Sequence, residues 1–126
     1  MSLISLPDQL REVFHNRASL ELSLSRLGCK EDCIELFRRI EQWVNEFAND
    51  QPNDVETRKE IVSILNLTLK GFCATHPNIV YQYDVVCDER NNPPSVVSDG
   101  KLVYSILMKF SHHIETFAFN RTVGDA

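Results

Sequence analysis

The chain has 126 residues and a formal net charge of −5, with 43% hydrophobic and 25% charged residues. This length predicts a single globular domain with its own core, and the interleaved charges disfavour a general nucleic-acid binder, which presents a basic face. No apolar run reaches the length of about 18 residues that a membrane span needs, and the opening MSLISLPDQLREVF lacks the features of a secretory signal.

The N-terminal part is expected to hold a short helix and a strand. The segment after Pro7, DQLREVF, has helical spacing of its apolar residues. Further on, Leu20, Leu22 and Leu24 alternate with polar residues, which is the period of a half-buried strand. We therefore expect a strand over residues 19–26.

Two longer helices are expected next. Apolar residues recur at intervals of three and four from Cys33 to Phe47, which predicts a helix over about residues 31–49. The segment ANDQPND interrupts this pattern. Asp54 or Asn53 is expected to cap a second helix that runs to about residue 73.

The rest of the chain is typical of strands. The runs IVYQYDVVCD, KLVYSILMKF and IETFAFNRTV are rich in β-branched and aromatic residues. In the second run Leu102, Tyr104, Ile106 and Met108 share one face. The order predicts an α+β fold with the two longer helices packed on a small, mostly antiparallel sheet. We expect residues 1–28 to form an N-terminal helix and strand, and residues 29–126 to form the core domain.

No catalytic residue, cofactor or metal ligand is assigned. The sequence holds no GxSxG, P-loop, GxGxxG or HExxH motif. His112 and His113 are adjacent, and adjacent residues of a strand point to opposite faces. The cysteines at positions 29, 33, 73 and 87 are expected to be buried thiols. A zinc site would need two ligands beyond Cys29 and Cys33, and a disulfide between these two requires that the helix has not begun at Cys29.

The connection between the first two strand runs, DERNNPPSVVSDGK, is much longer than a two-residue hairpin turn. One interpretation is a rigid surface turn, because Pro fixes φ and Asn forms local hydrogen bonds. Val96 and Val97 are apolar residues in a loop. We expect them to cover the core or to contact a neighbouring chain.

Residues 85–110 resemble the C-terminal domain of contractile tail sheath proteins. The matching motif residues are Cys87-Asp88-Glu89, Asn91-Asn92-Pro93 and Val96-Val97-x-Asp99-Gly100, followed by Leu102-Val103 and Ile106. A second block resembles the family's two helices and the break between them through Gln42-Trp43-Val44 and Pro52-Asn53-Asp54. With the final IETFAFN, the resemblance covers about residues 30–120.

The sequence also departs from the family's pattern. A sheath subunit carries a large N-terminal portion and outward domains that have no counterpart here. Met108-Lys109-Phe110 and Ser111-His112-His113 stand where the family has proline motifs. The resemblance therefore implies the polymerising core alone, as in a sheath initiator, a collar or terminator ring, a minimal sheath subunit or an excised sheath domain.

The resemblance implies a non-enzymatic, structural component of a contractile tail or injection machine. It would be made in the cytoplasm of a bacterial host and located in the virion tail or contractile particle. Its partners would be copies of itself or neighbouring sheath subunits, with sixfold symmetry, and a tail tube or baseplate protein. No nucleic acid, membrane or cofactor is implied. From the residues alone, an unrelated soluble binding module or small enzyme is the alternative.

In the sheath family, neighbouring subunits exchange terminal arms, each of which adds a strand to the next sheet. The residues here that match such arms are Leu20, Leu22 and Leu24 near the N-terminus and Thr116, Phe117, Ala118 and Phe119 near the C-terminus. The alternative is that both segments pair within their own chain. The family also uses charge complementarity toward its inner tube, which points to Arg38, Arg39, Arg58 and Lys59; a solvated helix face is the alternative for these four.

Overall fold

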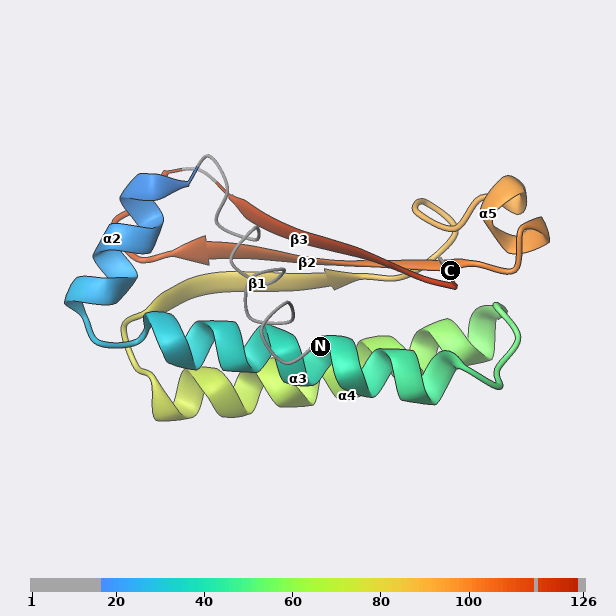
Figure 1. Cartoon of the computed structure of the whole chain (residues 1–126), viewed down its shortest axis with the longest axis horizontal. Coiled ribbons are helices and arrows are strands. Elements are labelled where there is room, and N and C mark those ends of the chain that lie inside the picture. The colour runs from blue at the N-terminus through green and yellow to red at the C-terminus, as the bar shows by residue number, and fades with distance from the viewer. Residues whose placement is uncertain (1–16, 115, 125–126) are drawn as a thin grey trace, which may run out of the picture. The chain divides into compact units, whose positions relative to one another are not determined.

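A computed structural model describes residues 17–114 and 116–124 (Figure 1). In chain order, its elements are α2 (Ala18–Arg26), α3 (Lys30–Ala48), α4 (Val55–Thr75), β1 (Val80–Val86), α5 (Pro94–Ser98), β2 (Leu102–Phe110) and β3 (Phe117–Val123). The short helix expected after Pro7 lies outside the described residues. The described residues divide into two compact units, one up to Glu41 and one from Gln42 onward.

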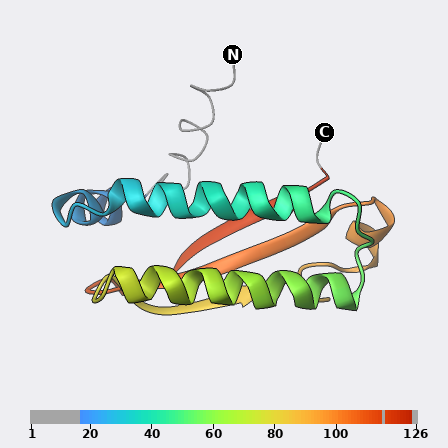
Figure 2. The ribbon, with the colours of Figure 1, turned by 90° about the horizontal axis from the view of Figure 1, so that it is seen from below.

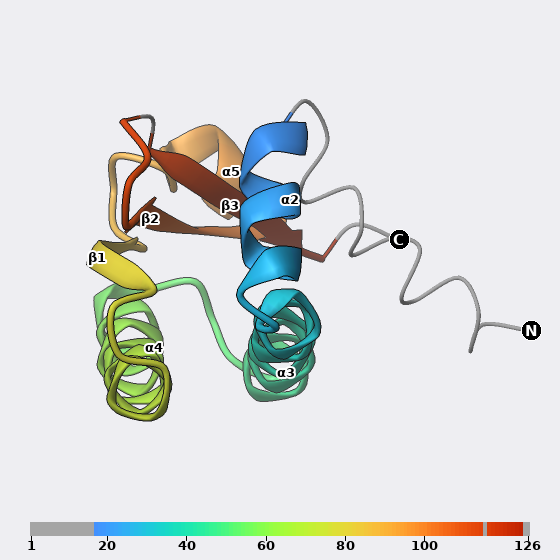
Figure 3. The same cartoon turned by 90° about the vertical axis from the view of Figure 1, so that its left-hand side faces the viewer.

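The fold is α+β, which confirms the prediction from the order of the elements. In the C-terminal unit α4 runs back along β1 (Figure 2), and α5 contacts β2. The end-on view shows α4 and the sheet as two layers (Figure 3). None of the described helices combines the length and apolar character that a bilayer crossing requires.

The strand expected over residues 19–26 is wrong, because these residues form α2. Leu20 and Leu24 are four residues apart, so one helical turn brings both to the same buried side, whereas Leu22 is 51% exposed. Leucines at three alternate positions fit the two-residue period of a strand, and the first and third of them also fit the 3.6-residue period of a helix. This segment contains no β-branched residue to favour a strand, and Ala, Leu, Glu and Arg favour a helix.

The two longer helices are confirmed within a residue or two of their expected bounds. In α3 the buried side chains include Cys33, Phe37 and Ile40, which follow helical spacing. Asp54 caps α4: its side chain accepts a hydrogen bond from the main-chain N of Thr57 at 2.9 Å. The buried residues of α4 stand almost every fourth position and form one stripe: Thr57, Ile61, Leu65, Leu69 and Phe72.

The sheet has the order β1-β2-β3, and both pairs are antiparallel. Every second residue of the central strand β2 is buried, from Leu102 to Phe110, as its sequence predicts. In β3 Phe117 and Phe119 are buried and Ala118 between them is exposed. Among the described strands, β1 and β3 are the two edges of the sheet.

Candidate functional site

The connection between β1 and β2 carries the largest motif of the sequence, and it lies at one end of the sheet (Figure 1). It leaves β1 at the buried Cys87, forms a turn, continues as the short helix α5 and enters β2 after Gly100. Gly100 has a left-handed φ of 71° that favours glycine.

Asn92 fastens this connection to β2. The residue is 3% exposed. Its Nδ2 donates to the main-chain oxygens of Asp88 (3.1 Å) and Val103 (2.8 Å), and its Oδ1 accepts from the main-chain N of Val103 (2.8 Å). A side chain thus supplies the paired hydrogen bonds that a neighbouring strand would supply to β2. The interpretation as a mere surface turn is wrong at Asn92.

Asn91 closes the other side of the turn. Its Nδ2 donates to the main-chain oxygen of Val86 (2.8 Å), and its Oδ1 accepts from the main-chain N of Asp88 (3.0 Å). Asp88 also pairs with Arg90, whose Nη2 lies 2.8 Å from Oδ2. The hydrogen bonds from Arg90 lower the pKa of the Asp88 carboxyl. The two asparagines together bind both strand ends to the connection.

Asn53 joins this turn to the segment between α3 and α4. Its Nδ2 donates to Oδ1 of Asn92 (3.0 Å) and to the main-chain oxygen of Lys101 (2.8 Å), and its Oδ1 accepts from Nη1 of Arg58 (2.6 Å). From the sequence, Asn53 was considered as a helix cap and as a motif residue, but not as a partner of Asn92. The feature of the sequence that indicated a role beyond capping was its position in the Pro52-Asn53-Asp54 motif.

The rest of the motif loop lies at the surface. No residue of α5 is buried; Val96 is half-buried and Val97 is 39% exposed. Pro93 and Asp99, which flank the helix, are exposed. The loop therefore presents Val97 as an exposed apolar side chain, and a contact between the two valines and a neighbouring chain stays a prediction.

The four cations proposed to face a tube differ in their surroundings. Glu35 accepts hydrogen bonds from Arg38 (Nη2–Oε2 2.6 Å) and Arg39 (Nε–Oε2 3.0 Å), and chiefly the bond from Arg38 lowers the pKa of Glu35 to about 2. Arg58 is half-buried against Asn53. Lys59 is exposed. Three of the four are thus engaged by neighbours on their own chain.

The residues expected to pair between subunits also differ in their secondary structure. The N-terminal three belong to the helix α2, which removes them from any strand pairing. In β3, Phe117 pairs with Met108, and Phe119 pairs with Ile106, within the same chain. Thr116 is exposed and precedes the strand. The edge of β3 that faces away from β2 has no strand beside it within the described residues.

The cysteines are free thiols. Burial raises the pKa of Cys33 to about 12 and that of Cys87 to about 11, so both remain protonated and poorly reactive at neutral pH. Cys29 immediately precedes α3, which begins at Lys30. In the part of the chain that the structure describes, no three His, Cys, Asp or Glu side chains gather as metal ligands would.

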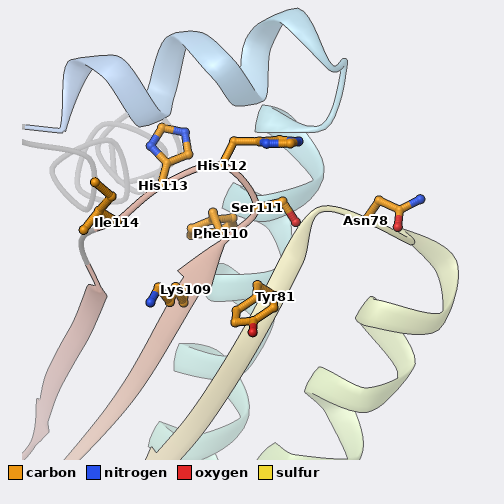
Figure 4. Close-up of a pocket in the computed structure, with 8 residues that line it drawn as sticks. All are labelled: Asn78, Tyr81, Lys109, Phe110, Ser111, His112, His113 and Ile114. Atoms are coloured by element: carbon orange, nitrogen blue, oxygen red, sulfur yellow. The ribbon is translucent and has the colours of Figure 1, made fainter.

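A second feature lies at the opposite end of the sheet, where α4 leads into β1 and β2 ends. It is an open hollow of about 780 Å³ (Figure 4). Its lining residues are Asn78, Tyr81, Lys109, Phe110, Ser111, His112, His113 and Ile114. His112 and His113 follow β2 in a turn, so the rule that adjacent residues of a strand point to opposite faces does not apply to them, and both line this hollow.

Comparison of the chain with protein-family models, with curated proteins and with solved structures found no match.

Proposed function

We propose that this chain is a structural, non-enzymatic subunit of a contractile tail or related injection machine, with a core like the C-terminal domain of tail sheath proteins. The observation that supports the proposal is the junction between Asn53 and Asn92. The two sequence blocks that resemble the family contribute one asparagine each. Two motifs that meet in one hydrogen-bonded junction support the resemblance to the family more strongly than two motifs that lie apart.

The edges of the sheet support an assembly role. Within the described residues, neither the outer edge of β1 nor that of β3 has a partner strand. Unpaired edges are binding sites for strands of other chains. In this proposal the edges of β1 and β3 accept strands from neighbouring subunits, and the Asn92 junction keeps the β1–β2 connection rigid while they do so. The helix α2 takes no part as a strand.

In the particle, this chain would form a ring with copies of itself or with sheath subunits, in sixfold arrangement, around a tail tube or on a baseplate. Lys59 is an exposed cation that could face such a tube. The subunit would act as an initiator, a collar or terminator, or a minimal sheath subunit, in the virion tail or contractile particle.

The first test is the copy number of this chain relative to tube protein, measured by quantitative mass spectrometry of purified particles from its source. One ring per particle identifies an initiator, collar or terminator. A number equal to that of the tube protein identifies a minimal sheath subunit. Absence from the particles contradicts the proposal.

The second test blocks the β3 edge. Asn120 and Thr122 are exposed residues of β3, and lysines on an edge strand oppose pairing with another strand. We expect N120K/T122K to remain folded and to be lost from particles. The matched control is S63K/N66K, which adds the same charge to exposed positions of α4 and should be incorporated normally. Equal incorporation of the two variants contradicts pairing at this edge.

A further inference from the structure

Three backbone irregularities converge on the hollow at the end of β2. The pairing of β1 with β2 shifts register between Val80 and Gln82, which is where Tyr81 stands. Asn78 and His112 both have a left-handed φ of 68°. The main-chain N of Ser111 donates to the oxygen of Ile79 at 2.9 Å and ties the two loops together. Bulges and left-handed residues other than glycine recur where a protein aims side chains at a ligand.

The polar groups of the hollow suit a negatively charged ligand. Lys109, His112 and His113 bring nitrogen atoms to its lining, and none of the eight described residues that line it is a carboxylate. This stands out in a chain whose net charge is −5. Within the described residues, the side chains of Ser111 and Asn78 make no hydrogen bond, so their donors remain available to a ligand.

The apolar groups of the hollow suit a protein segment. Ile114 is 92% exposed and Tyr81 is 73% exposed. Among the large hydrophobic residues that the structure describes, these two are the most exposed. Tyr81 lies in β1 and Ile114 in the connection after β2, and Figure 4 shows Phe110 and Ser111 between Ile114 and Asn78. The ammonium of Lys109 lies 6.0 Å from the centre of the Tyr81 ring, so charge and apolar surface adjoin. Exposed apolar residues grouped in this way mark protein-interaction sites.

We infer that this hollow docks a short acidic and apolar segment of another protein. The segment would place carboxylates beside Lys109 and the two histidines, and an apolar side chain against Tyr81 and Ile114. The hollow is open along the surface, which suits an extended segment better than an enclosed small molecule. The inference is independent of the assembly role, because it concerns the end of the sheet and not its edges.

The experiment uses the full chain and an array of capped heptapeptides in which acidic and apolar residues alternate. The best-binding peptide is labelled with a fluorophore, and its affinity is measured by fluorescence anisotropy. We expect saturation below about 1 mM. Two control peptides replace every carboxylate by its amide, or every apolar residue by serine, and both should bind more weakly.

Substitutions then test whether the peptide binds in the hollow. Ile114→Ser should weaken binding roughly tenfold through lost apolar burial, and Lys109→Gln about two- to fivefold through a lost exposed ion pair. The matched controls are Leu67→Ser and Lys70→Gln, exposed residues of α4 outside the hollow. Both should bind as the unchanged protein does. Circular dichroism confirms that each variant is folded.

The inference is overturned if no peptide of the array binds more tightly than its amide control. It is also overturned if Ile114→Ser and Lys109→Gln bind as tightly as their α4 controls. Either result leaves the assembly proposal untouched, since that proposal is tested on particles and on the β3 edge.

Discussion

The two ends of the sheet use their polar side chains in opposite ways. At the end where β1 leads into α5, Asn53, Asn91 and Asn92 direct their amides at main-chain groups and at each other. At the other end, the side chains around His112 and His113 make no hydrogen bonds within the described residues. There the main-chain hydrogen bond from Ser111 to Ile79 joins the two turns.

This difference separates structural residues from residues that remain available for binding. A buried amide that satisfies main-chain groups is costly to remove and contributes to stability. A solvated amide, imidazole or ammonium contributes little to stability and can bind a partner. Substitutions at the Asn92 end should therefore change unfolding, and substitutions in the hollow should change binding.

The largest effect is expected at Asn92. Asn92→Ala removes the amide that bonds to Val103, Asp88 and Asn53 and leaves the half-buried main-chain N–H and C=O of Val103 without these hydrogen bonds. We expect a loss of about 3 kcal/mol in the free energy of unfolding, measured by urea denaturation. Asn66→Ala, at an exposed position of α4, is the control and should change it by less than about 0.5 kcal/mol. Equal stability of the two variants would show that the junction is not structural.

The next effect is expected where β3 ends beside the loop. Gly124 has a φ of 99°, and a Cβ on it would lie 2.9 Å from the main-chain oxygen of Gly100. Gly124→Ala should therefore cost about 2 kcal/mol of unfolding free energy, from backbone strain and the close contact. Gly71→Ala is the control, because nothing lies within 4 Å of its added Cβ and alanine favours the helix α4. A neutral Gly124→Ala would contradict the close approach.

A smaller effect is expected at Asn53. Asn53→Ala removes the bonds to Lys101 and Asn92 at the half-buried end of the junction, and we expect a loss of about 1.5 kcal/mol. Combined with Asn92→Ala it forms a double-mutant cycle. The coupling energy should be about 1 kcal/mol, because the two side chains share a hydrogen bond. Strict additivity would show that the two motifs are energetically independent.

At the hollow, replacing His112 by glycine should improve stability. His112 has a left-handed backbone conformation with φ 68°, which costs a non-glycine residue about 1 kcal/mol. His112→Gly removes this cost. Thermal unfolding should show a gain of about 0.5 kcal/mol, while the affinity for the acidic peptide falls. His113→Gly is the matched control: its φ is not positive, so glycine there should destabilise by about 0.5 kcal/mol. A destabilised His112→Gly would show that the imidazole has a structural role.

The smallest effect is a pH dependence of the Asn92 end. The main-chain N–H of Thr57 lowers the pKa of Asp54, and Arg90 lowers that of Asp88. Because both folded values lie below the value of about 3.9 in an unfolded chain, each carboxylate contributes stability above that pH and loses it as the pH falls. Asp54→Asn keeps the helix cap. Its unfolding free energy should fall less steeply than that of the unchanged protein between about pH 5 and pH 2; parallel curves would contradict the assignment.

The sequence predicted the strands and the two long helices well, because each repeats its apolar pattern many times. β2 alternates over nine residues, and α4 presents one buried stripe from Thr57 to Phe72. The segment of α2 was wrongly predicted to be a strand, because the spacing of Leu20, Leu22 and Leu24 is compatible with both a strand and a helix. Only burial distinguishes Leu22 from its neighbours, and burial depends on what the rest of the chain provides.

The candidate sites were predictable only in part. The motif around Asn92 was visible as a sequence pattern, but its partner Asn53 is remote in sequence, and no local rule connects the two. The hollow was less visible still. It joins the turn before β1 with the turn after β2, and no local pattern of the sequence connects these two turns.

By itself, the sequence determined what repeats locally: the α+β order, a helix cap at Asp54 or Asn53, and the shared face of alternate residues in β2. Periodicity and capping are properties of neighbouring residues and need no distant partner. Only the tertiary structure decided that Asn92 is buried and that Asn78 and His112 border one hollow. Antiparallel pairing of β1 with β2 brings these residues together, because it sets remote turns side by side.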